Sequence, residues 1–316
     1  MAQHYGSNWE YAKFILFAHI LNPFWEGRVE RRSRRNYYNY RRVAAYLKKY
    51  LPFVENLEVE DITQWKKGQG ENPQPGKIYS IWFQGEENAP ELVKVCFERM
   101  KKAYGDRYVI LDKESIKDFI RLPQHIWQKW EEGKMKAAHF SDICRVALLY
   151  QHGGMWFDAT DYLTSKVPQW IEEADVFIFR DGPRFTPQKF IQSCFMRAKK
   201  GHPLYKAWLD FLSEYWLHED TTIDYFLLHF MLRFLVDNNK EVNRLFYEMP
   251  QVPQTPTHLL WHLHRAHPFS EDLYKECTKD TFFQKTSFKE LHAIDPLPGS
   301  VAEFIIKKKI PEEYNL

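Results

Sequence analysis

Three polar side chains recur at steps of three residues within a stretch that is otherwise mostly apolar. His139, Asp142 and Arg145 lie in residues 137–150, which contain no Gly or Pro. The pattern predicts a largely buried helix with these side chains on one face. An Asp–Arg pair at this spacing can simply stabilise a helix by roughly 0.2–0.5 kcal/mol. It can also bind a ligand, because a carboxylate accepts hydrogen bonds from hydroxyl groups and a guanidinium donates several to phosphate oxygens.

Two carboxylates follow this predicted helix. Gly153 and Gly154 end it, the bulky residues 155–157 form a short strand, and Asp158 and Asp161 come just after that strand. Ligands of open α/β sheets bind beyond the carboxyl ends of the strands. Carboxylate oxygens are also the ligands that Mg²⁺ and Mn²⁺ prefer. The segment therefore predicts one wall and the floor of a binding site, with Asp158 as a candidate metal ligand.

The surrounding sequence predicts the elements that must position these residues. A β-rich run at 77–83, a helix at 89–104 and a strand at 108–111 follow one another. This strand–helix–strand order indicates a parallel α/β sheet. Further elements are expected downstream: a helix at 123–134 that could form a lid, strands at 176–179 and 190–195, helices at 203–215 and 224–236, and a more helical C-terminal region.

The central stretch also carries a resemblance to a known family. S-D-I-C-R, followed by L-L-Y-Q-H-G-G-M-W-F-D-A-T, resembles the signature of family 32 glycosyltransferases, and especially their bacterial capsular polysaccharide synthesis branch. Yeast-type mannosyltransferases and clostridial glucosylating toxins are more distant relatives. The resemblance implies a GT-A (Rossmann-like) domain over 77–316, with the most specific match at 77–215. It also implies transfer of a sugar from a nucleotide-diphosphate sugar to a saccharide acceptor, with retention of anomeric configuration.

The resemblance further implies a divalent metal, Mn²⁺ or Mg²⁺, held by an Asp-x-Asp motif. Asp158 matches the first Asp of that motif. Thr160 stands where the second Asp would be, and Asp161 lies one place later. The predicted metal ligands are therefore Asp158 and Asp161, with Thr160 as an alternative for the second contact.

The remaining donor contacts also come from the resemblance. It implies that Asp142 and Arg145 bind the sugar hydroxyls and phosphate of the donor, with a UDP-sugar as the favoured donor, and that these two act with Asp158 in catalysis. Trp82, in I-W-F-Q-G of the first strand, corresponds to a Trp that lies against the nucleotide base. From the residues alone, Trp82 is an equally good core residue. No nucleophile is evident from the spacing.

Composition and cysteine usage narrow the class of protein. The chain has 316 residues and a formal net charge of +2. Its overall charge therefore does not indicate binding to nucleic acid. Its four cysteines show no C-x-x-C spacing, so free thiols in a reducing compartment are expected. We see no signal-peptide pattern and no run of about 20 apolar residues that would span a bilayer. These features predict a cytoplasmic protein.

The N-terminal segment, residues 1–67, is predicted to be a helical, basic extension, ending at a Gly- and Pro-rich boundary. Residues 14–21 are apolar, and residues 26–42 hold seven Arg against two Glu, which gives a charge of +5. Two helices packed on the main domain would explain this pattern. A peripheral contact of residues 9–42 with an anionic membrane surface is the alternative, since capsule acceptors are commonly lipid-linked.

Competing interpretations of the chain stay open. His258 and His262 have helical zinc-ligand spacing, but the Glu of H-E-x-x-H is missing. A metal-dependent nucleotide-sugar hydrolase would use the same carboxylates as a transferase. A non-catalytic polyanion-binding or scaffold protein on a degenerate transferase fold would explain the missing second Asp and the Arg-rich run.

Overall fold

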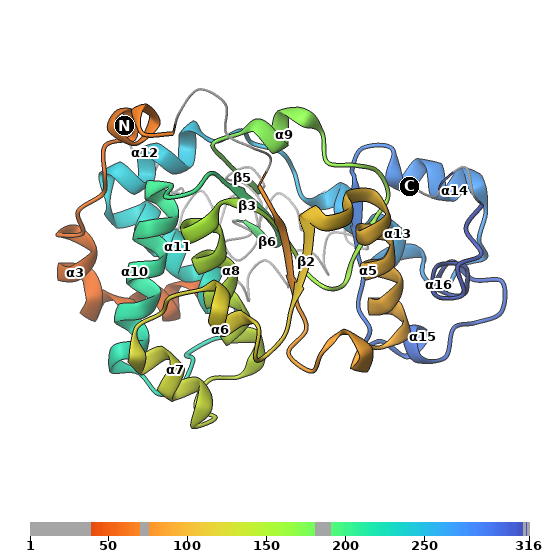
Figure 1. Ribbon diagram of the computed structural model, residues 1–316, viewed down its shortest axis with the longest axis horizontal. Helices are drawn as coiled ribbons and strands as arrows, with labels where there is room; N and C mark the ends of the chain where they lie inside the picture. The colour runs from red at the N-terminus through yellow and green to blue at the C-terminus, as the bar shows by residue number, and fades with distance from the viewer. Residues whose placement is uncertain (1–38, 70–75, 181–190, 312–313, 315–316) are drawn as a thin grey trace, which may run out of the picture.

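The computed structural model describes residues 39–69, 76–180, 191–311 and 314. A five-stranded sheet lies between two groups of helices (Figure 1). On one side are α8 (Ala137–His152), α10 (Pro203–His218) and α11 (Leu227–Asn238). On the other is α5 (Glu91–Tyr104), followed outward by the C-terminal helices.

The sheet is mixed. Its strands are β1 (Ile78–Ile81), β2 (Tyr108–Leu111), β3 (Gly154–Phe157), β5 (Val176–Phe179) and β6 (Gln192–Ala198), in the order β2-β1-β3-β6-β5. β1 is parallel to β2 and β3, which confirms the parallel arrangement predicted from the sequence. β6 is antiparallel to both β3 and β5, so the prediction of a parallel sheet is wrong there. Two antiparallel strands can be joined without a crossover helix, and the sequence predicted no helix between β5 and β6.

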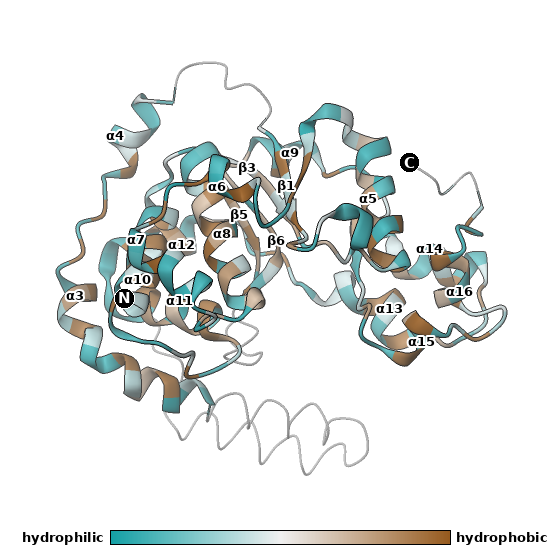
Figure 2. Cartoon of the chain, turned by 60° about the horizontal axis from the view of Figure 1, so that its bottom comes forward, coloured by the Kyte–Doolittle hydropathy of each residue, from teal (hydrophilic) through white to brown (hydrophobic). Residues whose placement is uncertain are grey.

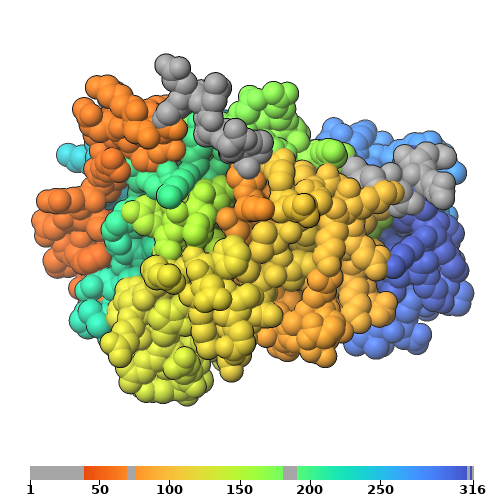
Figure 3. All heavy atoms as spheres, in the orientation of Figure 1, coloured from red at the N-terminus to blue at the C-terminus, as the bar shows by residue number. Residues whose placement is uncertain are grey.

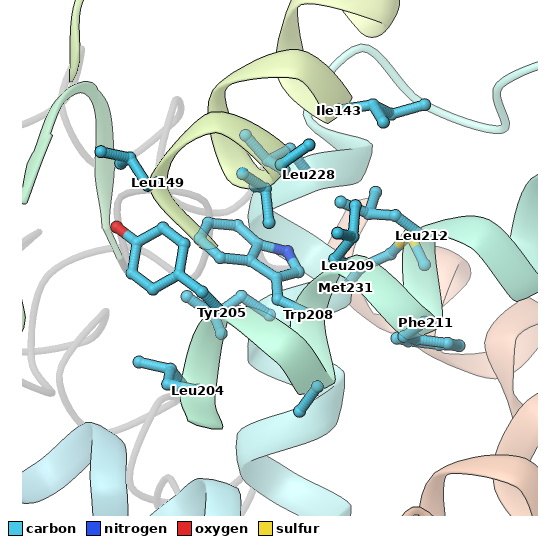
Figure 4. Close-up of a cluster of buried hydrophobic side chains, with 14 of the residues drawn as sticks. Ile143, Leu149, Leu204, Tyr205, Trp208, Leu209, Phe211, Leu212, Leu228 and Met231 are labelled. Atoms are coloured by element: carbon cyan, nitrogen blue, oxygen red, sulfur yellow. The ribbon is translucent and has the colours of Figure 1, made fainter. Parts of the chain in front are cut away.

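Both faces of the sheet are covered, and successive strand residues alternate between two hydrophobic clusters. Tyr79 and Trp156 pack with α8, α10 and α11, whereas Ile78, Met155 and Phe157 pack on the α5 side. This burial explains why β2, β3 and β5 are apolar runs without polar alternation. Figure 4 shows the first cluster, in which the Trp208 indole lies among side chains that include Leu149, Tyr205 and Leu228.

Other predicted elements have the following outcomes. The helix at 137–150 is confirmed as α8, and the strands at 108–111 and 176–179 match the observed bounds of β2 and β5. The segment predicted as a lid is α7 (Gln124–Glu131), and its Trp130 stacks on Phe140 of α8 at 4.5 Å between ring centroids. The remaining helices of this half are short: α6 (Ile116–Phe119), α9 (Gln169–Glu173) and α12 (Lys240–Glu248).

The described part of the N-terminal segment packs on the main body. Helices α3 (Leu51–Glu55) and α4 (Ile62–Lys67) bring Val54 and Trp65 into the same cluster as α10 and α11. Arg42 forms an ion pair with Asp224 at 2.9 Å. Figure 3 shows this segment, in orange, at the end of the molecule opposite the C-terminal helices. The predicted apolar run at 14–21 and the Arg-rich residues before 39 lie outside the described residues.

The C-terminal region forms a third cluster on the outside of α5. Its helices are α13 (Leu259–His264), α14 (Glu271–Thr278), α15 (Leu291–Ile294) and α16 (Val301–Ile306). Leu92 of α5 packs with Trp261, Tyr274 and Val301 of this region. In Figure 2 these helices form a group beside α5 and away from α10–α12. A two-stranded sheet of β4 (Asp161–Leu163) and β7 (Phe283–Lys285) joins the region to the residues after β3.

Within the part of the chain that the structure describes, no helix has both the length and the apolar character required to cross a membrane.

Two glycines set the start of β3. Gly153 ends α8 with φ +70°, and Gly154 follows with φ +102°, a region that favours glycine. A Cβ on Gly154 would lie 2.1 Å from the Lys77 carbonyl oxygen, beside the point where β1 and β3 pair. The close approach of the two strands therefore requires glycine at this position.

We predict that Gly154→Ala lowers the free energy of unfolding by about 3 kcal/mol or more, because a methyl group clashes with backbone as well as adopting positive φ. Gly133 is the matched control: its φ is +72°, but nothing lies within 4 Å of an added Cβ. Gly133→Ala should cost only about 1–2 kcal/mol. Denaturant titration of both variants measures the difference, and equal costs would contradict the role given to Gly154.

Candidate active site

The carboxylate of Asp158 lies at the carboxyl end of β3 and is surrounded by donors. Its Oδ1 accepts a hydrogen bond from the Trp156 indole at 2.9 Å and lies 3.2 Å from Arg145 Nη1. Its Oδ2 accepts from Lys285 Nζ at 2.6 Å. The Asp158 side chain keeps 23% of its surface exposed. A charged group at a strand end is thus held by three elements and is still open to a ligand.

Arg145 links α8 to this carboxylate. Its guanidinium donates to the Ser193 carbonyl of β6 at 2.8 Å, and its Nη2 lies 3.2 Å from Asp142 Oδ1. It also lies over the Trp156 ring, 4.9 Å from the centroid. The structure therefore brings together Asp142, Arg145 and Asp158, the three residues that the sequence predicted as catalytic. Only 8% of the Arg145 side chain is exposed.

Lys285 is a site residue that the sequence analysis missed. It ends β7, where it stands opposite Asp161 of β4 in the antiparallel register. Besides Asp158, its ammonium donates to Thr160 Oγ1 at 2.8 Å and lies 3.4 Å from Asp161 Oδ1. No sequence signal could have found it, because β7 has only three residues and lies far along the chain from the acidic turn.

The charges of the site reinforce one another. Burial alone would lower the pKa of Lys285, but Asp158 and Asp161 raise it, so the ammonium stays protonated. Burial would raise the pKa of Asp158, yet Lys285 and Arg145 hold it below its usual range. Asp161 differs: burial raises its pKa to about 8, and Lys285 offsets this only in part. Asp158 is therefore the carboxylate of the cluster that stays ionised near neutral pH.

The sequence predicted that Asp158, Asp161 and Thr160 hold Mn²⁺ or Mg²⁺. Such a cation needs several oxygen atoms with free lone pairs. Each Asp158 oxygen already accepts a hydrogen bond, and the Lys285 ammonium lies among all three predicted ligands, so a divalent cation would have to displace this positive charge. Within the described ranges, no group of three or more His, Cys, Asp or Glu side chains could hold a metal. This donor set does not fit a resident divalent cation, and the expected metal remains a prediction.

Trp82 lies at the same edge of the sheet, directly after β1. Its ring meets Phe288, which follows β7, edge to face at 5.2 Å. The indole N–H is buried without a hydrogen-bond partner. A buried, unpaired donor is unusual in a native fold and suits a site that a ligand completes. The structure thus places Trp82 at the edge where β1 and β3 end, while its contact with a base remains a prediction.

The α11 side of the site is aromatic and partly open. His139 lies with its Nδ1 3.8 Å from Asp142 Oδ2, and its Nε2 is 3.1 Å from the Thr222 hydroxyl. Tyr225, which is 68% exposed, lies 6.0 Å from the His139 ring. The buried His229 faces the Ser193 hydroxyl at 3.3 Å, and burial lowers its pKa to about 4. This imidazole is therefore neutral near pH 7.

Two other sequence observations lie elsewhere. His258 and His262 stack ring on ring at 5.1 Å, and no metal-holding group includes them within the described residues. The four cysteines are all buried and free, as the spacing predicted: Cys96, Cys144, Cys194 and Cys277.

Individual proteins of known function or structure resemble this chain. Over 196 residues, 56% of this chain, it is 22% identical to an "O-glycosyltransferase braB" of Annulohypoxylon truncatum. The match covers 46% of that protein, so the chain spans about half the length of this curated relative. A solved structure, "PaToxG Glycosyltransferase", matches 85% of this chain and 96% of its own at 13% identity and a TM-score of 0.34, which does not identify the fold.

A family model gives the broadest match. It covers residues 25–296, which include α8, β3 and β7, the three elements that bring Asp142, Arg145, Asp158 and Lys285 together. The description of that family is "Capsular polysaccharide synthesis protein". The chain belongs to the capsular polysaccharide synthesis protein family.

Proposed function

We propose that this protein is a glycosyltransferase that moves a sugar from a nucleotide-diphosphate sugar to a saccharide acceptor in capsular or surface polysaccharide synthesis. The observation that carries the proposal is the convergence of Asp142, Arg145 and Asp158 at the end of β3, joined by contacts of 3.2 Å. Family membership and the glycosyltransferase name of the curated relative support it. The finer expectations, a GT-A fold, a UDP-sugar donor and retention of configuration, belong to the same proposal.

The proposed role of each residue follows from how much of its side chain is exposed. The Asp142 side chain is 16% exposed and offers an acceptor for sugar hydroxyl groups. Arg145 is more deeply buried, and its guanidinium N–H groups contact Ser193, Asp142 and Asp158. It therefore orients the two carboxylates and adds positive charge near the phosphates. Asp158 in turn orients Lys285.

Two other functions stay as alternatives: a nucleotide-sugar hydrolase, and a binding protein without activity. The acceptor is proposed to be a saccharide, free or lipid-linked. Contact with an anionic membrane through residues 9–42, and a place at the inner face of the membrane, are part of the proposal. Most of those residues lie outside the described ranges.

We predict that the full-length protein releases a nucleoside diphosphate from at least one sugar donor. A screen would incubate UDP-, GDP- and dTDP-sugars with the protein, with and without saccharide acceptors, and measure the freed nucleotide. Acceptor-dependent release indicates a transferase, and acceptor-independent release at the same rate indicates a hydrolase. Binding without turnover of any donor would favour the non-catalytic alternative.

Asp142→Asn tests whether the polar face of α8 binds a ligand or only stabilises the helix. We predict at least about a tenfold loss of kcat/KM, because the amide cannot replace a charged acceptor toward sugar hydroxyls. The matched control is Asp237→Asn, which breaks the pair of Asp237 with the buried Arg233 of α11. Both variants should lose similar stability in thermal melts. Equal kinetic losses in the two would show that the Asp142–Arg145 pair is only structural.

Asp158→Asn should affect both activity and stability, because it leaves the buried Arg145 and the partly buried Lys285 without their common carboxylate. Breaking a buried pair in this way costs about 3–5 kcal/mol. We expect most turnover to be lost and the free energy of unfolding to fall by a comparable amount. Asp210→Asn, which breaks the exposed Lys206–Asp210 pair, should change stability by less than about 1 kcal/mol. A fully stable Asp158→Asn protein would argue against the described cluster.

A further inference from the structure

One ammonium contacts all three residues that the sequence predicted as metal ligands. Lys285 Nζ lies 2.6 Å from Asp158 Oδ2, 2.8 Å from Thr160 Oγ1 and 3.4 Å from Asp161 Oδ1. These oxygens come from the turn after β3 and from the start of β4, and the lysine comes from β7. The oxygens predicted to bind a metal therefore already surround a single positive charge.

The position of this charge is fixed and still accessible. Lys285 is held in the β4–β7 register opposite Asp161, so its side chain stays on the same face of the small sheet. Its side chain keeps 20% of its surface exposed, and that of Asp158 keeps 23%. This cation lies at the carboxyl edge of the main sheet, where ligands of such sheets bind.

We propose that Lys285 supplies the positive charge that faces the diphosphate of the donor, so that donor binding and transfer require no divalent cation. The inference rests on the proposed glycosyltransferase function and assigns a substrate-contacting residue to it. Phosphate binding by a lysine ammonium is common, because the compact charge donates hydrogen bonds to phosphate oxygens.

The step that Lys285 assists is breakage of the bond between the anomeric carbon and the diphosphate oxygen. The electron pair of that bond stays on the diphosphate, which gains negative charge as it leaves. A new bond forms between the anomeric carbon and an acceptor hydroxyl oxygen, and the hydroxyl proton is released to solvent or a base. Lys285 stays protonated throughout and stabilises the charge that develops on the leaving group.

A structural role alone would have different consequences. If Lys285 only neutralised Asp158 and Asp161, its replacement would lower stability but leave the affinity of folded protein for a nucleoside diphosphate unchanged. If it faces the diphosphate, affinity should fall for UDP and much less for UMP, which lacks the second phosphate. The comparison of UDP with UMP therefore separates the two roles.

The first measurement uses the wild-type protein and calorimetric titration with UDP, GDP and dTDP, in excess EDTA and in Mn²⁺. We expect at least one diphosphate to bind equally well in both conditions. Binding that appears only with Mn²⁺ would overturn the inference and leave the proposed function standing. No binding of any diphosphate in either condition would overturn both.

The second measurement titrates Lys285→Met, a neutral side chain of similar length, with the diphosphate that binds best. We expect affinity in EDTA to fall by about tenfold to a hundredfold, with partial recovery in Lys285→Arg. Lys279→Gln, at an exposed lysine that ends α14, controls for the loss of one charge and should leave affinity unchanged. Unchanged affinity in Lys285→Met would overturn the inference.

Lys285→Met alone could fail to fold, because it leaves the buried carboxylates without their cation. The double variant Asp158→Asn/Lys285→Met removes the cation together with the ionised carboxylate that it pairs with, and it keeps the measurement possible. Far-UV circular dichroism and a thermal melt establish that each variant is folded before titration. The same outcomes decide for the double variant: weaker UDP binding with little change for UMP supports the inference, and unchanged UDP binding overturns it.

Discussion

The structure depends on compensating the charge of one partly buried carboxylate, that of Asp158. A carboxylate removed from water is costly unless partners compensate its charge and fill its hydrogen-bonding positions. Here the compensation comes from a helix on one face of the sheet and from a strand of the C-terminal region, through Arg145 and Lys285. The side chains of Arg145 and Lys285 must therefore be held in fixed positions at the end of β3. The glycine pair that starts β3, the contact of Arg145 with β6 and the pairing of β4 with β7 can all be understood as meeting that demand.

The sequence predicted the local half of this arrangement. The period of α8, the Gly153–Gly154 break and the carboxylate after a bulky strand are short-range signals, and the structure contains each of them. The mixed sheet was only partly predictable, because the direction of β6 depends on which neighbours it pairs with. Lys285 could not be predicted at all. It contacts a residue 127 positions away from a strand of three residues, and such a strand carries no periodicity to recognise.

The departure from the Asp-x-Asp pattern has a physical counterpart in the structure. Thr160, which the resemblance placed at the second Asp of the expected motif, accepts a hydrogen bond from Lys285. A divalent ion gains from each added carboxylate, whereas the single ammonium of Lys285 is already matched by the ionised Asp158. A further carboxylate here would add a negative charge, which would oppose the proposed binding of an anionic donor. A neutral hydroxyl at residue 160 is therefore compatible with a lysine as the central cation.

The β4–β7 pairing also bears on how the protein acquires its function during synthesis. A growing chain that has produced α8 and β3 already contains the Asp158 carboxylate and its Arg145 partner. The lysine arrives only after more than a hundred further residues have left the ribosome. Until β7 docks, Asp158 and Asp161 lack the ammonium that lies beside both carboxylates. The complete cluster therefore forms only after the C-terminal region has been synthesised and has brought β7 to β4.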